Sequence, residues 1–155
     1  MVAAKFKNPP MNPGPPKKVV VDATGLVAGR LATNLARRLL ANEEIHVVNA
    51  EKATISGTKE AVLDRYNFKR DVGTDRKGPY YPRVPHLMMK RTVRGMLMYQ
   101  ESPFHRAAYK RLRCYIGVPE ELASASAESI ANARPKNAYR SMTLGEIAKG
   151  LGAKF

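Results

Sequence analysis

The feature that most constrains the fold is a strand, helix, strand pattern over residues 19–49. Three valines at 19–21 predict a short buried strand, and residues 45–49 predict a second one. Between them we expect a helix over residues 27–41, because Leu31, Leu35 and Leu39 recur on one face while arginines lie off it. Consecutive strands joined by a helix pair in parallel through a right-handed crossover. The pattern therefore predicts an α/β domain.

Further elements follow along the chain. We expect a short extended segment at 53–55, a helix at 59–68, a surface loop at 71–85, a helix at 86–100, a helix at 103–112 and a strand at 113–118. Thr143 and Glu146 have capping-box spacing before a last short helix that runs to residue 149. Residues 123–133 are weakly specified, with helix as one alternative, so periodicity supports three strands and leaves a fourth open.

The helix predicted at 86–100 separates into two faces. Met89, Val93, Met96 and Leu97 occupy one arc, and Lys90, Arg91 and Arg94 occupy the next. Met88, Met89, Met96 and Met98 are interpreted as core residues that fill irregular gaps. This helix is therefore expected to pack with one face and to offer the other to a phosphate, although an ordinary solvated basic face is the alternative.

The first 18 residues have a different composition from the rest. They contain five prolines and four lysines and no acidic residue, which predicts an extended, polyproline-like arm. Ordering on a nucleic acid is the favoured role, and a solubilising tail is the alternative. No apolar stretch follows Lys5 and Lys7, so neither a signal peptide nor a membrane anchor is expected. Residues 19–155 are predicted to form a single α/β domain with a C-terminal helical tail, in a cytoplasmic protein.

The charge of the chain predicts a polyanionic partner. Lysine and arginine total 27 against 13 acidic residues, which gives a formal net charge of +14. Basic residues recur in the arm, in the first helix and in the segments 76–83, 90–94 and 105–113. Tyr80, Tyr81 and His86 add flat rings for unpaired bases or ribose. The distribution favours backbone and shape recognition of a folded RNA, against a basic surface with no specific ligand.

Several enzyme classes lack the residues that they need. Cys114 is the only cysteine, which excludes an intrachain disulfide and a multi-cysteine zinc site, and we expect it to be buried and inert beside Ile116 and Val118. His46, His86 and His105 have no metal-ligand spacing. The turn from Asp22 to Arg30 lacks the third glycine of a dinucleotide motif and the Lys-Ser/Thr of a P-loop. Gly29 is interpreted as permitting close helix packing or close approach of an RNA phosphate. No catalysis, cofactor, metal or small-molecule substrate is predicted.

Three long stretches resemble a known family. They read VVDATGLVAGRLATNLARRLL at 20–40, HVVNAEKATISGTK at 46–59 and MMKRTVRGMLMYQESPFHRAAYKRLRCYIGVPEE at 88–121. In this order they resemble the ribosomal protein L13 family of the large subunit. The loop YYPRVPH and the C-terminal residues 138–155 look like its archaeal and eukaryotic branch, and without the long eukaryotic extension an archaeal source is implied. The resemblance implies a three-layer α/β/α domain around a mostly parallel four-stranded sheet.

The resemblance also implies a function. Members bind large-subunit ribosomal RNA, lie beside neighbouring large-subunit proteins and join early in subunit assembly, without catalysis. The residues expected to contact rRNA are Lys17, Lys18, Arg30, Arg37, Lys52, Arg76, Lys77, Arg83, Lys90, Arg91, Arg94, Arg106, Lys110 and Arg111. Two other hypotheses stay open on the sequence: a regulatory RNA-binding module that acts off the ribosome, and a nucleotide-dependent enzyme that uses the turn at 25–30.

Overall fold

The computed structural model describes residues 14–73, 76, 78, 80–136 and 140–155. The strands are β1 (Lys17–Asp22), β2 (Glu43–Val48), β3 (Thr54–Ser56), β4 (Leu112–Cys114), β5 (Ala127–Glu128) and β6 (Ser141–Thr143). The α-helices are α1 (Ala28–Leu40), α2 (Lys59–Asp71), α3 (Pro85–Met96), α4 (Pro103–Lys110) and α5 (Leu144–Gly150), and the 3-10 helices are η1 (Ala50–Lys52), η2 (Glu120–Leu122) and η3 (Ala131–Ala133).

The main sheet has four parallel strands in the order β4-β2-β1-β5. Val19 pairs with Ile45 and Val21 with Val47, so β1 and β2 are joined through α1 as the sequence predicts. The predicted α/β class and the four-stranded parallel sheet are confirmed. A second sheet, for which the sequence has no local signal, pairs β3 with β6 in antiparallel fashion.

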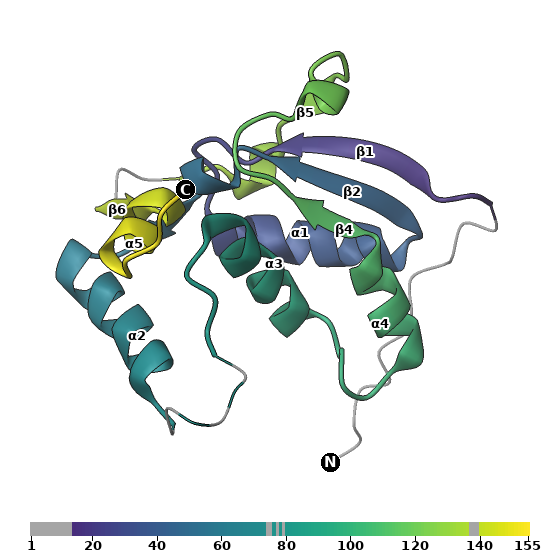
Figure 1. Cartoon of the computed structure of the whole chain (residues 1–155). Coiled ribbons are helices and arrows are strands. Elements are labelled where there is room, and N and C mark those ends of the chain that lie inside the picture. The colour runs from purple at the N-terminus through teal and green to yellow at the C-terminus, as the bar shows by residue number, and fades with distance from the viewer. Residues whose placement is uncertain (1–13, 74–75, 77, 79, 137–139) are drawn as a thin grey trace.

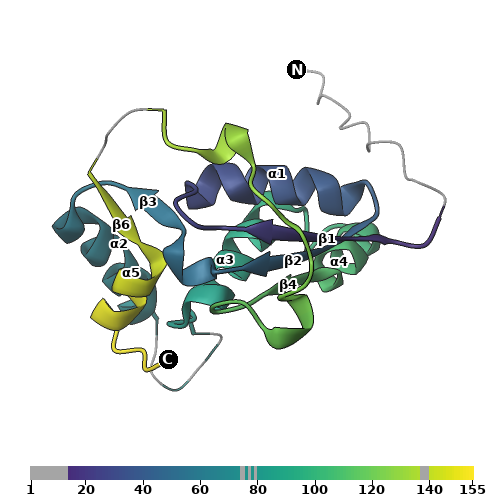
Figure 2. The ribbon, with the colours of Figure 1, turned by 90° about the horizontal axis from the view of Figure 1, so that it is seen from above.

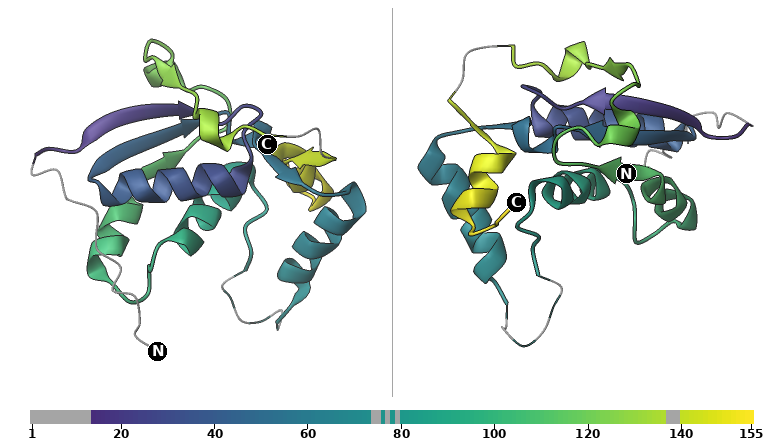
Figure 3. Two further views of the ribbon diagram at one scale, coloured as in Figure 1. Left: turned by 180° about the vertical axis from the view of Figure 1, so that it is seen from behind. Right: turned by 45° about the horizontal axis from the view of Figure 1, so that its top comes forward.

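The helices are distributed unevenly around the main sheet. Figure 1 shows α1, α3 and α4 along one side of it, with α1 nearest the viewer when the molecule is turned round (Figure 3). On the other side lies a thinner layer, in which the segment from η2 to η3 crosses in front of β2 and β1 (Figure 2). The helices α2 and α5 stand beside this body together with β3 and β6. No helix in the described part of the chain is long and apolar enough to span a membrane.

The core lies between α1, α3 and the sheet. The buried face of α1 consists of Ala28, Leu31, Ala32, Leu35, Ala36 and Leu39. It shares one cluster with Val19, Val21, Ile45 and Val47 of the strands and with Met88, Met89 and Val93 of α3. Asn42 ends this first helix with a left-handed backbone (φ +69°) and donates from Nδ2 to the Gly14 carbonyl oxygen.

The predicted arm overlaps the sheet at its end. β1 begins at Lys17, so Lys17 and Lys18 belong to a strand and not to the extended segment predicted for residues 1–18. Their register partners are Glu43 and Glu44 of β2. Opposite charges on neighbouring strands favour pairing, which explains why the strand starts earlier than its valines indicate. Residues 1–13 lie outside the described part of the chain.

The helix predicted at 86–100 is shorter than expected. It begins at Pro85 and ends at Met96, where Leu97 adopts an extended backbone and returns its side chain to the core. Met88 and Met89 are fully buried, but Met96 and Met98 are each 48% exposed, so their assignment to the core is wrong. The periodicity continues past the point where the backbone leaves the helix, and for that reason it overestimates the length.

The strand predicted at 113–118 is only three residues long. It begins at Leu112 and ends at Cys114. Helix α4 ends at Lys110, before the predicted residue 112. Cys114 is buried, and burial raises the pKa of its thiol to about 12, so the thiol is protonated and unreactive at neutral pH. Ile116 and Val118 are exposed, against the predicted apolar alternation. Gly117, with a left-handed backbone, turns the chain away from the sheet.

The weakly specified segment contains the fourth strand. Residues 123–133 form no α-helix, so that alternative is wrong; they contain β5 and the 3-10 helix η3. Helix α2 continues to Asp71, three residues beyond its predicted end. The capping box is confirmed, since the Glu146 backbone nitrogen donates to Thr143 Oγ1 (3.2 Å) and the Thr143 nitrogen donates to Glu146 Oε2 (2.9 Å).

The carboxyl ends of β1 and β2 are tied together by Asp22. Its Oδ1 accepts hydrogen bonds from the backbone nitrogen of Thr24 (3.0 Å), from Thr24 Oγ1 (2.7 Å) and from Asn49 Nδ2 (3.0 Å). Burial alone would raise the pKa of Asp22, but these hydrogen bonds, with help from Lys52, outweigh it and lower the pKa. The network fixes the turn that leads into α1.

We predict that Asp22→Ala lowers the free energy of unfolding at pH 7 by about 1–3 kcal/mol, because three donors lose a charged acceptor. A folded-state pKa below the ordinary carboxyl value means that this stability is complete above about pH 4 and disappears as pH falls through the folded value. Urea unfolding of both proteins, followed by circular dichroism from pH 7 down to pH 3, should show the difference shrink with acidification.

Asp22→Asn is the matched control, because it keeps an oxygen acceptor and removes the charge. It should lose less stability than Asp22→Ala at pH 7. A constant difference between wild type and Asp22→Ala across the whole pH range would contradict the role assigned to the carboxylate.

Candidate nucleic-acid interface

Helix α3 presents three cations on one exposed face because its opposite face is fixed in the core. Met88, Met89 and Val93 are buried. With 3.6 residues per turn, Lys90, Arg91 and Arg94 then project toward solvent, and all three are only partly buried. The face predicted from the sequence to be basic is therefore basic and accessible.

One end of this face is lined by tyrosines from α2 and from the segment before α3. The Arg91 guanidinium lies 5.2 Å from the centre of the Tyr81 ring. Tyr81 meets Tyr66 of α2 edge to face, with ring centres 5.7 Å apart. Lys69 Nζ lies 5.0 Å from the Tyr66 ring and 5.5 Å from the Tyr81 ring. These distances are within the range of cation–π attraction, so two cations share one aromatic pair.

The other end repeats the arrangement with residues of the α3–α4 turn and of α4. The Arg94 guanidinium lies 4.5 Å from the centre of the Tyr99 ring, and Lys90 Nζ lies 5.2 Å from that of Tyr109. Tyr99 and Tyr109 meet edge to face at 5.2 Å. We call the whole set the basic–aromatic surface; its members are Lys69, Lys90, Arg91, Arg94, Tyr66, Tyr81, Tyr99 and Tyr109.

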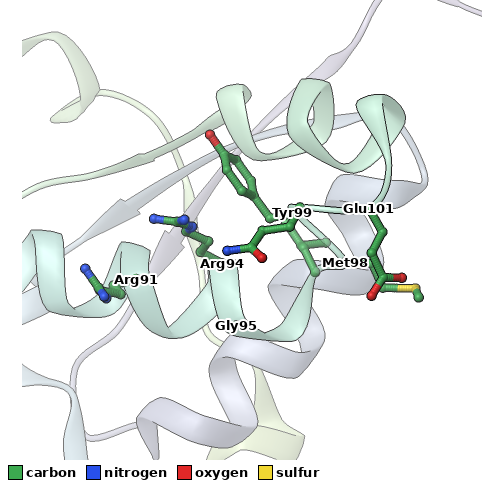
Figure 4. Close-up of a pocket in the computed structure, with 8 residues that line it drawn as sticks. Arg91, Arg94, Gly95, Met98, Tyr99 and Glu101 are labelled. Carbon is green, nitrogen blue, oxygen red and sulfur yellow. The ribbon is translucent and has the colours of Figure 1, made fainter. Parts of the chain in front are cut away.

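An open hollow of about 360 Å³ lies in this surface, lined by α3 and by the turn that follows it. Figure 4 shows Arg94 directed toward the Tyr99 ring and Arg91 one turn earlier on the same helix. Glu101 lies at the far end of the hollow and points away from both guanidinium groups. The hollow has room for a phosphate or a base edge beside two arginine side chains.

The charges of this surface are not neutralised internally. The salt bridges between described residues involve Arg38, His46 and Arg70, and none involves a cation of the basic–aromatic surface. Burial raises the pKa of Tyr66, Tyr81 and Tyr109, so these rings stay neutral at physiological pH. Burial, with a smaller effect of Lys90, lowers the pKa of His86, which is therefore neutral as well. The positive potential comes from lysine and arginine alone.

The remaining predicted contacts are placed around the molecule. Arg83 is exposed and lines a second hollow with Tyr80 and Tyr81, next to the basic–aromatic surface. Arg106 and Lys110 are exposed on α4, where Arg106 Nη1 donates to the Gln100 carbonyl oxygen (3.1 Å). Arg76 is exposed in the loop, and Lys77 lies outside the described residues. These positions extend the basic region along α4 and the loop.

Other predicted contacts lie away from that region. Arg30 and Arg37 are exposed on α1, and Lys17, Lys18 and Lys52 are exposed at the two ends of the central strands. Arg30 Nη1 donates to the Arg134 carbonyl oxygen (2.9 Å). Arg111 is only partly exposed, and its Nη2 donates to the Leu39 carbonyl oxygen (2.9 Å) near the end of α1. The predicted set does not gather on one face, and Arg111 has a structural contact within the fold.

Four members of the basic–aromatic surface were not expected from the sequence to contact RNA, either as cations or as rings: Lys69, Tyr66, Tyr99 and Tyr109. Tyr66 and Lys69 are three residues apart in one helix, and this spacing signals a shared face. No such signal exists for Tyr99, because the predicted helix wrongly includes it. Tyr109 belongs to α4, and only the tertiary structure brings its ring beside Tyr99.

Gly29 has no packing reason among the described residues. A Cβ atom built there meets no heavy atom of another described segment within 4 Å, so the interpretation that it permits close helix packing is wrong. Close approach of an external phosphate to this first turn of α1 stays a prediction. Gly25, in contrast, is required by the turn itself, since it adopts φ +69° while its nitrogen donates to the Lys52 carbonyl oxygen (3.2 Å).

Comparisons with known proteins agree with one another. The family model described as ribosomal protein L13 matches residues 16–121. The protein named large ribosomal subunit protein uL13 from Methanococcoides burtonii is 44% identical over 140 residues, which cover 88% of this chain and 99% of that protein. The protein of the same name from Archaeoglobus fulgidus is 48% identical over 136 residues, 86% of each chain. The one from Methanopyrus kandleri is 42% identical over 142 residues, 89% of each chain.

The contact between Arg94 and Tyr99 should be measurable as a coupling energy. We predict that the variants Arg94→Met, Tyr99→Leu and the double variant give a stabilising coupling of about 0.5–1 kcal/mol in a double-mutant cycle, the range for a partly exposed cation–π pair. Urea unfolding followed by circular dichroism provides the three free-energy differences. Strictly additive losses would mean that Tyr99 does not orient Arg94.

Proposed function

The chain belongs to the ribosomal protein L13 family, and from this membership we propose that it is a structural constituent of the large ribosomal subunit. In this role it binds large-subunit rRNA, acts early in subunit assembly and resides in the cytoplasmic ribosome beside other large-subunit proteins. It is a scaffold and not an enzyme. The three relatives described above are archaeal, which supports the archaeal source that the sequence resemblance implies.

One observation carries the proposal that this chain itself contacts RNA: the basic–aromatic surface concentrates four cations without an internal counter-ion in the described residues. Phosphates displace condensed counter-ions when they meet such a surface, and this release favours binding. The tyrosine rings keep the cations apart without neutralising them. A polyanion with flat bases supplies both kinds of contact that the surface offers.

We assign the residues in order of support. Arg91 and Arg94, which line the hollow, contact phosphate groups, and Lys90 and Lys69 extend the contact to either side. Arg83, Arg106 and Lys110 continue it along the loop and α4. Lys17, Lys18, Arg30, Arg37, Lys52 and Arg76 contact separate rRNA segments around the molecule. Holding several segments at once is what an assembly scaffold requires.

Density-gradient fractionation tests the placement of the protein. A lysate of the native source is sedimented, the chain is located in the gradient, and the experiment is repeated after washes of rising salt. We expect co-sedimentation with the large subunit through moderate salt, because many phosphate contacts must be broken together. A chain that remains at the top of the gradient at every salt concentration would contradict the proposed function.

We predict that Arg91→Ala/Arg94→Ala weakens binding to isolated large-subunit rRNA about tenfold or more, and lowers the slope of log affinity against log salt by roughly two, one for each lost phosphate contact. Filter binding at several salt concentrations gives both quantities. Circular dichroism should be unchanged, because the two side chains lie on the solvent face of α3.

Lys149→Ala/Lys154→Ala is the matched control. It removes the same charge from exposed positions in and after α5 that do not belong to the basic–aromatic surface. Equal losses for the two pairs would mean that net charge alone drives binding. Unchanged affinity for the Arg91→Ala/Arg94→Ala protein with unchanged circular dichroism would remove α3 from the RNA contact.

A further inference from the structure

The segment between β4 and η3 differs in charge from the rest of the molecule. From Cys114 to Ala133 the sequence has three glutamates and neither lysine nor arginine, in a chain of net charge +14. Glu128 is paired with Arg38 (3.0 Å), but Glu120 and Glu121 are exposed, and neither forms a salt bridge with a described residue. Such a surface repels phosphate. We call residues 116–129 the acidic edge.

The acidic edge also exposes apolar side chains from a fixed backbone. Ile116 is 38% and Val118 50% exposed. Between them Gly117 is held at both polar atoms: its oxygen accepts from the Asn49 nitrogen (2.9 Å), and its nitrogen donates to Glu51 Oε2 (3.1 Å). The two apolar side chains are therefore presented by an ordered turn. A partner that covers them binds with little loss of conformational entropy in this loop.

A third feature is a strand edge that no other described strand covers. Within the described part of the chain, β5 pairs with β1 on one side and is the last strand of the sheet on the other. Residues 123–129 are small alanines, serines and one glutamate, and all are exposed. An edge strand with small side chains leaves its backbone accessible to another extended chain. Figure 1 places η2 and β5 across the sheet from α3 and α4, which carry most of the basic–aromatic surface.

We propose that the acidic edge docks an extended, lysine- and arginine-rich segment of a neighbouring protein of the large subunit. Glu120 and Glu121 pair with its cations, Ile116 and Val118 cover its apolar side chains, and β5 aligns its backbone. Charge complementarity selects this occupant over RNA, whose phosphates the glutamates repel. The inference rests on the proposed function, because it names the chemistry of a protein partner within the large ribosomal subunit and the surface where that partner binds.

The test separates RNA binding from protein docking. The full-length Glu120→Lys/Glu121→Lys protein is compared with Glu60→Lys/Asp64→Lys, which makes the same charge change at exposed positions of α2. Both should bind protein-free large-subunit rRNA at least as well as wild type. In competition with wild type for particles reconstituted with the other large-subunit proteins, we expect the first variant to be incorporated about tenfold less and the second to be unaffected, because reversed charges at a docking site disfavour the partner.

Equal incorporation of the two charge-reversed proteins would overturn the docking proposal and leave rRNA binding intact. Failure of the wild-type protein to bind rRNA or to enter particles would overturn the proposed function instead. The two failures are therefore distinguishable.

Photo-crosslinking identifies the occupant. A photo-reactive amino acid replaces Val118 in the full chain, and Phe155, which is 48% exposed, is the control position. In assembled subunits we expect a crosslink from position 118, and not from 155, to a basic segment of a second protein. A crosslink from 118 to rRNA, to another copy of this chain or to a segment without lysine and arginine would overturn the assignment.

Discussion

The packing of α1 against β1 and β2 is the interaction on which the rest of the structure depends. Leu31, Leu35 and Leu39 are fully buried against the strand valines, and burial of such side chains contributes about 1.5–3 kcal/mol each. Strands β4 and β5 add to the two edges of this unit. Helix α3 rests on the same cluster through Met88, Met89 and Val93, so the core fixes its rotation. Because the rotation is fixed, Lys90, Arg91 and Arg94 can only face outward.

Aromatic rings offset the repulsion between neighbouring cations on that outward face. Cations placed close together repel one another, and carboxylates that relieved the repulsion would also cancel the attraction for phosphate. Tyr66, Tyr81, Tyr99 and Tyr109 attract the cations through their ring faces and carry no charge. One edge-to-face pair joins α2 to the segment before α3, and the other joins the α3–α4 turn to α4. The rings therefore stabilise the arrangement without lowering its net charge.

Charge is also separated across the main sheet. The basic–aromatic surface belongs to α2, α3, α4 and the segments beside them, whereas the segment from η2 to β5 carries glutamates and small residues without lysine or arginine. A uniformly basic protein would meet RNA on every side. The separation suits a protein that contacts RNA over most of its surface and leaves the acidic edge to a basic polypeptide, as proposed above.

The sequence by itself determined the elements whose signals are local. The valines of β1, the leucine spacing of α1, the basic and apolar faces of α3 and the Thr143–Glu146 capping box were all predicted, because each depends on residues within a few positions of one another. The family and its proposed role also followed from the sequence, since three long stretches carry the resemblance. Only the tertiary structure decided the end of α3 at Met96, the pairing of β3 with β6, the fourth strand β5 and the assembly of tyrosines from four segments. These depend on contacts between residues far apart in the chain, and neither periodicity nor composition specifies which distant side chains meet.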